Sequence, residues 1–146
     1  MSDIKLRQAN PLDAKSLFDL RNHPAVRQQS NNAAEIDIYE HQRWFDAVMS
    51  NSSRKILIAE QGEKFVGMVR FDCLDDSCRM SWAIIPKTQG QGLGKQMLKM
   101  AIEQMKGCTL SAEIKHNNFA SIKIAEYVGM KLIKQTRDIL LYQNDY

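Results

Sequence analysis

The chain has 146 residues, of which 44% are apolar and 25% charged, as in an ordinary globular domain large enough for one hydrophobic core. Its 20 lysine and arginine residues exceed its 17 aspartate and glutamate residues, and the formal net charge of +3 is too small and too dispersed to predict nucleic-acid binding. The chain has no apolar run of about 18 residues, and its first residues lack the apolar segment of a secretion signal. We therefore expect one cytoplasmic domain over residues 1–146, with a small anionic molecule as ligand and neither membrane nor nucleic acid as partner.

The first third of the chain predicts one strand and two helices. Apolar and polar residues alternate over 4–6, as in a half-buried strand. The Asn10-Pro11 pair is a typical helix start, and Pro24 disfavours helical backbone just before it, so the first helix ends there. Residues 25–32 show little periodicity and predict a loop. A second helix is predicted over 37–49, where apolar residues recur at the helical period.

Three strands and two cysteines follow. Apolar runs over 55–60, 65–71 and 78–85 are separated by polar turns, which predicts an antiparallel meander. Cys73 and Cys78 fall on adjacent strands of its second hairpin. With one further cysteine and three histidines, the chain offers no zinc-ligand quartet, so no metal site is expected. The cysteines are interpreted as structural or incidental, which suits a reducing cytosol.

A glycine-rich stretch follows the third of these strands. It consists of Gln89, Gly90, Gln91, Gly92, Leu93, Gly94 and Lys95. Apolar residues at helical spacing continue to Met105, so the pattern predicts a strand, a turn and a helix. Glycines let the backbone approach a ligand, and the unpaired N–H groups and dipole of the first helical turn attract anions. We therefore predict a phosphate or diphosphate site here, with Lys95 adding a positive charge.

Three known glycine-rich sequence patterns that bind phosphate groups can be compared with this stretch. A P-loop needs Gly-x-x-x-x-Gly-Lys-Ser/Thr, but the spacing from Gly90 to Lys95 is one residue short and Gln96 carries no hydroxyl. A dinucleotide-binding turn needs Gly-x-Gly-x-x-Gly in the first strand–helix unit, which differs in both spacing and position. The pattern Gln/Arg-x-x-Gly-x-Gly/Ala fits at every position from Gln89 to Gly94, and it resembles the acyl-CoA pyrophosphate loop of the GNAT acetyltransferase superfamily. A turn that only links a strand to a helix is the structural alternative.

The remaining chain predicts a strand over 108–114, a helix from Asn118 to Val128 that Gly129 closes, and a last strand or hairpin over 131–142. The element order is then β-α-α-β-β-β-α-β-α-β, a mixed α/β chain. This order is similar to that of the GNAT fold. The resemblance implies a mixed, mostly antiparallel central sheet with helices on both faces, and acyl-CoA in the gap between two splayed central strands.

A second motif lies within residues 110–130. Many GNAT members have a strand, then Asn-x-x-Ser/Ala, a helix and Gly-Phe, and Asn118, Ser121 and Gly129-Met130 fall on those positions. The resemblance implies that Asn118 binds the pantetheine–phosphate region of the coenzyme, with a simple helix N-cap as the alternative. It further implies an acetyltransferase that takes acetyl-CoA as co-substrate. A homodimer is common in this fold, although nothing in the sequence decides it.

Acetyl transfer to an amine needs a hydrogen-bond donor for the developing oxyanion and a base for the amine proton. In GNAT enzymes a backbone N–H before the glycine loop polarises the carbonyl, which implies Ile84 here, with Ile85 also beside the coenzyme. Glu113, in an otherwise apolar strand, is the candidate base, since partial burial would raise its pKa toward the working pH. The alternatives are a solvent-facing Glu113 and base catalysis through a water chain.

The leaving thiolate needs a proton, and here the chain departs from the family pattern. Many members place a tyrosine seven residues after the asparagine, whereas this position is Ala125. Tyr127 is turned roughly 200° around the helix from the missing residue and does not replace it. The acid is then Ser121 or Tyr142, or the thiolate leaves unaided.

The acceptor amine is the least determined part. Residues 20–27 and 40–45 resemble the corresponding stretches of amino-sugar N-acetyltransferases of pseudaminic-acid and surface-polysaccharide synthesis. The resemblance implies a small-molecule amine as acceptor and favours a UDP-linked 4-amino-4,6-dideoxy sugar. The candidate contacts are His41, Trp44, Arg70, Arg79 and Trp82. The structural alternatives are a core position for Trp44, a helix-surface position for His41 and a solvated sheet face for the two arginines. Three other functions stay open: acetylation of protein N-termini as in similar ribosomal-protein enzymes, non-catalytic acyl-CoA binding, and ATP or dinucleotide binding.

Overall fold

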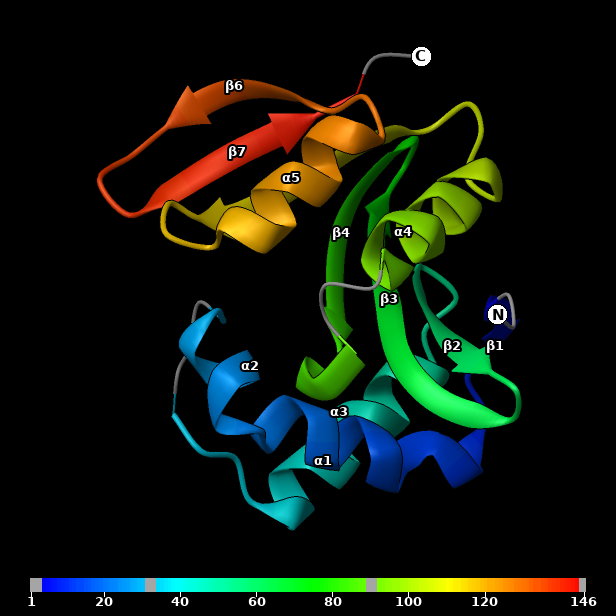
Figure 1. Cartoon of the computed structure of the whole chain (residues 1–146). Helices are drawn as coiled ribbons and strands as arrows, with labels where there is room; N and C mark the ends of the chain where they lie inside the picture. Colours follow the sequence, from blue (N-terminus) through cyan, green and yellow to red (C-terminus); the bar gives the residue numbers. More distant parts are fainter. Residues whose placement is uncertain (1–3, 31–33, 89–91, 145–146) are drawn as a thin grey trace.

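The computed structural model describes residues 4–30, 34–88 and 92–144, and one sheet runs through it (Figure 1). Its strands are β1 (Ile4–Gln8), β2 (Arg54–Gln61), β3 (Lys64–Leu74), β4 (Ser77–Ile84), β5 (Thr109–Lys115), β6 (Lys131–Gln135) and β7 (Ile139–Gln143). Within these ranges they form a seven-stranded sheet in the order β1-β2-β3-β4-β5-β7-β6. Neighbouring strands are antiparallel except β4 and β5, which are parallel. The predicted mixed, mostly antiparallel sheet is confirmed.

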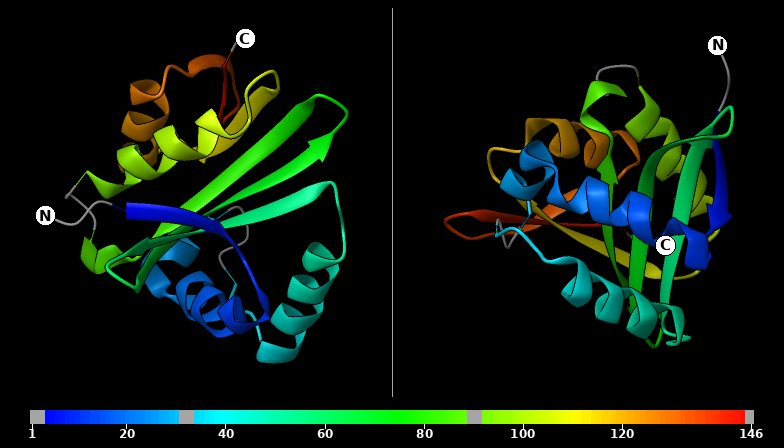
Figure 2. Two further views of the ribbon diagram at one scale, coloured as in Figure 1. Left: turned by 90° about the vertical axis from the view of Figure 1, so that its right-hand side faces the viewer. Right: turned by 90° about the horizontal axis from the view of Figure 1, so that it is seen from below.

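Helices cover both faces of the sheet, as predicted (Figure 2). One face carries α1 (Ala14–Asn22), α2 (Pro24–Gln28) and α3 (Ile38–Met49), and the other carries α4 (Leu93–Glu103) and α5 (Phe119–Tyr127). Because side chains alternate along each strand, the sheet supplies apolar residues to two cores, a larger one under α4 and α5 and a smaller one under α1 and α3. No helix in the described part of the chain is long and apolar enough to cross a membrane.

Two short segments differ from the sequence prediction. Residues 25–32 were predicted as a loop, but α2 begins at Pro24, because the His23 ring accepts a hydrogen bond from the Ala25 N–H and caps the helix. A helix of five residues is too short to show a period. The first helix starts with a 3-10 turn, η1 (Pro11–Asp13), capped by Asn10, and a second such turn, η2 (Pro86–Thr88), follows β4. The chain ends in a β6–β7 hairpin whose second strand pairs with β5.

The parallel pair β4–β5 separates soon after it begins. Its register contains three residue pairs, which are Ser77–Thr109, Cys78–Leu110 and Arg79–Ser111. Beyond Arg79, β4 continues along β3 as far as Ile84, while β5 continues along β7. The two strands therefore diverge like the arms of a V, and the predicted splay of two central strands is confirmed (Figure 1).

The two predicted hairpin cysteines lie opposite each other at the closed end of this V. Cys73 of β3 and Cys78 of β4 are cross-strand partners with Cα atoms 4.0 Å apart, and they form a disulfide. Their placement on adjacent strands is confirmed, and Cys108 is the free thiol. The pairing goes further than the prediction, which treated all three as structural or incidental. Because Cys78 also pairs with Leu110 of β5, the crosslink lies where β4 and β5 are still joined.

Gly67 lies where α4 packs against β3 and β4, at the open end of the V. A Cβ at Gly67 would lie 2.6 Å from the Ala83 backbone oxygen and 3.2 Å from Met97 Sδ, so the Gly67→Ala variant must shift the backbone. We expect it to lower the free energy of unfolding by about 1–3 kcal/mol in urea titrations, as for other overpacked sites.

The matched control is Gly94→Ala. Its Cβ would meet Ile124 Cδ1 at 2.6 Å, but this atom ends a flexible side chain that can turn away. We therefore expect this variant to lose less stability than Gly67→Ala. Equal stability of Gly67→Ala and the unsubstituted protein would show that the β3–β4 backbone adjusts freely.

Candidate active site

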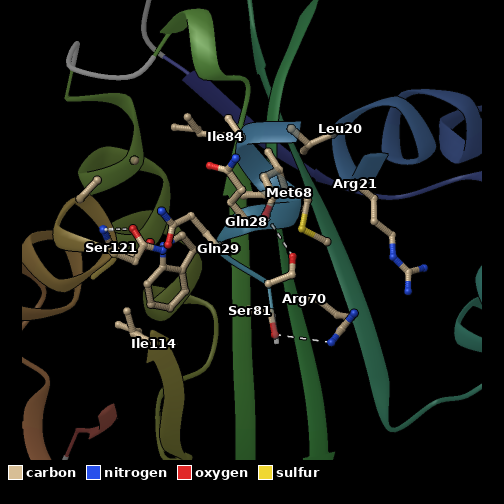
Figure 3. Close-up of a pocket in the computed structure, with 18 of the residues that line it drawn as sticks. Leu20, Arg21, Gln28, Gln29, Met68, Arg70, Ser81, Ile84, Ile114 and Ser121 are labelled. Atoms are coloured by element: carbon tan, nitrogen blue, oxygen red, sulfur yellow. Dashed lines mark hydrogen bonds between the residues drawn. The ribbon is translucent and has the colours of Figure 1, made fainter. Parts of the chain in front are cut away.

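A cleft of about 970 Å³ opens where β4 and β5 diverge (Figure 3). Its lining comes from both faces of the sheet. One end is formed by α1, α2 and α3 with residues such as Arg21, Trp44 and Arg70, and the other by the first turns of α4 and α5. Because the sheet is interrupted between β4 and β5, one continuous cleft connects the two sides.

The open edge of β4 presents backbone groups to this cleft. Ile85 donates its N–H to the Val66 oxygen at 2.8 Å, so the pair Val66–Ile85 is hydrogen-bonded across the antiparallel ladder. Successive residues of such a strand point their N–H groups to opposite sides, so those of Ile84 and Trp82 point away from β3 and toward the gap. The Ile85 N–H is used within the sheet, and its oxygen accepts from Thr88 in η2. The Ile84 N–H thus points in the direction that an oxyanion donor needs. Its role as that donor stays a prediction.

The described part of the glycine-rich stretch forms the start of α4. Gln89, Gly90 and Gln91 lie outside the described residues. Gly92 is the N-cap of α4 with φ +76°, a left-handed conformation that favours glycine. Gly92, Leu93, Gly94 and Lys95 all line the cleft, so the α4 N-terminus and its unpaired N–H groups face it.

Two members of that stretch also have structural contacts. Gly94 is buried where α4 crosses α5, beside Ile124, so its lack of a side chain serves helix packing. Lys95 lines the cleft, and its Nζ lies 5.2 Å from the centre of the Tyr127 ring. That cation–π contact is weak enough for a phosphate to compete with it.

Asn118 caps α5 and lines the cleft at the same time. Its Oδ1 accepts a hydrogen bond from the Ser121 N–H at 3.2 Å. The two interpretations of Asn118 therefore do not exclude each other, because the cap uses the oxygen and leaves the side-chain amide as a donor. Ser121 also lines the cleft, one turn into the helix (Figure 3).

Glu113 lies in the cleft but is less enclosed than predicted. Its side chain is 32% exposed, and Oε1 forms an ion pair with Arg79 Nη1. Arg79 itself is not among the described residues that line the cleft, so it contacts the site through Glu113. One carboxylate oxygen is therefore engaged, and the other is left to accept a proton. The base role of Glu113 stays a prediction.

The candidates for the general acid are spread over different environments. Ala125 is fully buried, and Tyr127 is 55% exposed on the surface of α5. Tyr142 is buried in the larger core, where burial and the nearby Glu126 raise its pKa, and it does not line the cleft. Of the two candidates Ser121 and Tyr142, Ser121 is thus the one placed in the cleft.

His41 has a different environment from the predicted alternative. It is 1% exposed, so the interpretation as a helix-surface residue is wrong. Its Nε2 lies 2.9 Å from the Ala14 oxygen, and its ring packs against Phe18, Trp44 and Phe45. Burial lowers the pKa of His41, more than the bond to Ala14 raises it. His41 is therefore a neutral, closely packed part of the cleft wall, whose Nε2–H donates to Ala14.

Trp44 is only partly buried, and it brings two arginines together. The guanidinium carbons of Arg21 and Arg70 lie 4.9 Å and 5.5 Å from its ring centre. Arg21 was not singled out from the sequence. The sequence feature that points to Arg21 is its position four residues after the buried Leu17, which places it on the core-facing side of α1.

Trp82 lines the cleft from β4. Its Nε1 is buried and has no hydrogen-bond partner within the described ranges. A buried indole N–H normally finds an acceptor, so this donor is available to a bound molecule.

Comparison with known proteins agrees with this geometry. Residues 3–131 match the family model described as Acetyltransferase (GNAT) domain, and the chain belongs to this family. The chain is 28% identical to acetyltransferase PseH of Campylobacter jejuni subsp. jejuni strain 81-176, over 97% of this chain and 96% of that protein. It is also 28% identical to PseH of strain ATCC 700819, over 92% and 89% of the two chains. The predicted family and the predicted acetyl-CoA-dependent N-acetyltransferase activity are confirmed.

Solved structures show the same fold. A domain from Methanocaldococcus jannaschii superposes with a TM-score of 0.86 at 23% identity, over 99% of both chains. Spermidine N-acetyltransferase from Vibrio cholerae, in complex with CoA and spermine, has a TM-score of 0.86 at 14% identity, over 97% of this chain and 95% of that chain. Ribosomal-protein-alanine N-acetyltransferase from Brucella melitensis has a TM-score of 0.80 at 21% identity, over 96% and 98%. At these identities the likeness concerns the fold alone.

The double role of Asn118 leads to a prediction with a built-in control. Asn118→Ser keeps a cap oxygen but removes the amide donor, whereas Asn118→Ala removes both. We expect both variants to bind acetyl-CoA about tenfold more weakly by calorimetry, as for one lost hydrogen bond to a charged or strongly polar group. Only the alanine variant should also lose about 1 kcal/mol of stability. If the serine variant binds acetyl-CoA normally, Asn118 is a helix cap without a coenzyme contact.

Proposed function

We propose that this chain transfers an acetyl group from acetyl-CoA to the amine of a UDP-linked 4-amino-4,6-dideoxy sugar. The observation that carries the proposal is the cleft that passes between β4 and β5, with a helix N-terminus at one end and cationic side chains at the other. Support for the acceptor comes from the resemblance of residues 20–27 and 40–45 to amino-sugar enzymes and from the identity with the two PseH proteins.

In this proposal the coenzyme end of the cleft is the one lined by α4 and α5. The α4 N-terminus from Gly92 to Lys95 holds the diphosphate, and the Asn118 amide donates to the pantetheine–phosphate region. Acetyl-CoA supplies the thioester, whose carbonyl oxygen accepts the Ile84 N–H as negative charge develops on it. A cytoplasmic location and a homodimer remain expectations of the same proposal.

The chemical step uses few side chains. Glu113 accepts a proton from the sugar ammonium, directly or through a water molecule. The amine nitrogen then bonds to the acetyl carbon and the carbon–sulfur bond breaks. The second proton that the nitrogen loses passes to the leaving thiolate, directly or relayed through water or the Ser121 hydroxyl. In this proposal the Trp82 Nε1–H, which has no partner among the described residues, donates to a polar group of either substrate.

A thiol-release assay with acetyl-CoA and a panel of amines tests the acceptor. The panel contains a UDP-4-amino-4,6-dideoxy sugar, spermidine, and peptides beginning Ala-Arg or Met. We expect kcat/KM for the nucleotide sugar to exceed the others by about 100-fold or more, because buried polar groups reject molecules that leave them unpaired. Faster turnover of a peptide would instead support N-terminal acetylation. Acetyl-CoA binding without turnover of any amine would support a binding module.

The proposed base generates a pH prediction. A base matters most where the amine is protonated, so Glu113→Gln should reduce kcat/KM most at low pH and least above the amine pKa. The affinity for acetyl-CoA should be retained. Glu103→Gln is the matched control, since Glu103 is an exposed residue of α4 that does not line the cleft. A pH–rate profile of Glu113→Gln that parallels the unsubstituted one would remove Glu113 as the base.

A further inference from the structure

Arg21 is the one arginine of the cleft wall whose charge the described protein leaves without an ion-pair partner. Its Nη1 is buried and has no hydrogen-bond partner among the residues that the structure describes. Burial and the nearby Arg70 lower its pKa, while Glu40 acts on it only at a distance. A buried donor without an acceptor destabilises the folded protein, so such a group calls for an explanation. A ligand that supplies the missing hydrogen-bond acceptor would explain why the Arg21 Nη1 is left unpaired.

The neighbouring acid is already used. Asp72 binds two arginines, with Oδ1 accepting from Arg54 Nε at 2.7 Å and Oδ2 accepting from Arg70 Nε at 3.0 Å. Its single negative charge therefore faces two guanidinium groups. Arg21 adds a second guanidinium group beside Trp44 that Asp72 does not neutralise. Glu35 and Glu40 also line the cleft, but among the described residues neither forms an ion pair with Arg21, which is therefore available to an anion.

The two cleft arginines are also held in place. Trp44 lies within cation–π distance of both, and the Arg70 Nη2 donates to Ser81 Oγ at 3.5 Å (Figure 3). Arg21 and Arg70 thus extend from α1 and β3 into the same part of the cleft, on the side of the sheet opposite α4 and α5. Planar guanidinium groups bind the paired oxygens of phosphates and carboxylates better than a point charge does.

We infer that Arg21 and Arg70, positioned by Trp44, form an oxyanion subsite that selects acceptors carrying a phosphate or carboxylate group. The inference rests on the proposed function, where the group is the diphosphate of the nucleotide sugar, and it assigns specificity to Arg21. The coenzyme diphosphate has its own site at α4, so the two anionic groups lie on opposite sides of the open edge of β4. The subsite also disfavours polyamines, because a cationic acceptor meets like charges there.

Calorimetry on the full chain tests the subsite, with UDP and succinate as the phosphate and carboxylate probes. We expect UDP to bind, and Arg21→Gln to weaken UDP binding at least tenfold while leaving acetyl-CoA binding unchanged, as for a lost charge-assisted hydrogen bond. In turnover assays the same variant should raise KM for an anionic acceptor more than it lowers kcat. Arg43→Gln is the control, because Arg43 is an exposed α3 residue outside the cleft.

The outcomes separate the subsite from the proposed acceptor. Equal UDP affinity of Arg21→Gln and the unsubstituted protein overturns the subsite, as does a lack of binding of both probes. Arg21-dependent UDP binding without acetylation of the amino sugar supports the subsite and rejects the proposed function. Arg21-dependent binding of succinate without binding of UDP also supports the subsite and rejects the proposed function. If Arg21→Gln also weakens acetyl-CoA binding, Arg70→Gln is tested by the same calorimetry. An Arg70→Gln variant that binds UDP as tightly as the unsubstituted protein then overturns the subsite.

Discussion

The structure depends on an interruption of hydrogen bonding in the middle of its sheet. β4 and β5 are paired over three residues and then part, although both strands continue with other partners. An unpaired strand edge inside a domain is unfavourable unless something else takes up its N–H and C=O groups. Here that edge faces a cleft in which a substrate can do so. The interruption that weakens the sheet is thus also the feature that opens the cleft.

The helices keep the two arms of the V apart. On one side α4 and α5 pack so closely that a Cβ at Gly94 would meet the Ile124 side chain, and Gly67 lets α4 approach β3. On the other side α1 and α3 enclose His41 and Trp44 in a smaller core. Each helix layer forms one end of the cleft as well as one core of the protein. The positions of the residues that line the cleft therefore follow from the packing of apolar residues.

Much of this organisation is predictable from the sequence, for identifiable reasons. The long strands and helices have clear periods, and the glycine-rich stretch and Asn118 fall on the spacing of the GNAT motifs. The five-residue α2 escaped prediction because it is shorter than the pattern that would reveal it. Arg21 escaped because its surroundings are set by the Trp44 ring on α3 and the charge of Arg70 on β3, which no local pattern records. The surface alternative for His41 is wrong because polarity alone does not show that Ala14 satisfies one of its nitrogens.

The two ends of the cleft differ in how firmly they are built. Six residues of α4 are buried, whereas α2 contributes no buried residue. The Lys115 Nζ donates to the Gln28 oxygen at 2.9 Å and so ties β5 to α2, through an exposed contact of small net strength. Local opening is cheapest where burial is least, so α2 is the part of the wall that yields first. Sequence changes there can reshape the end of the cleft formed by α2 during evolution, while the end formed by α4 and α5 stays as it is.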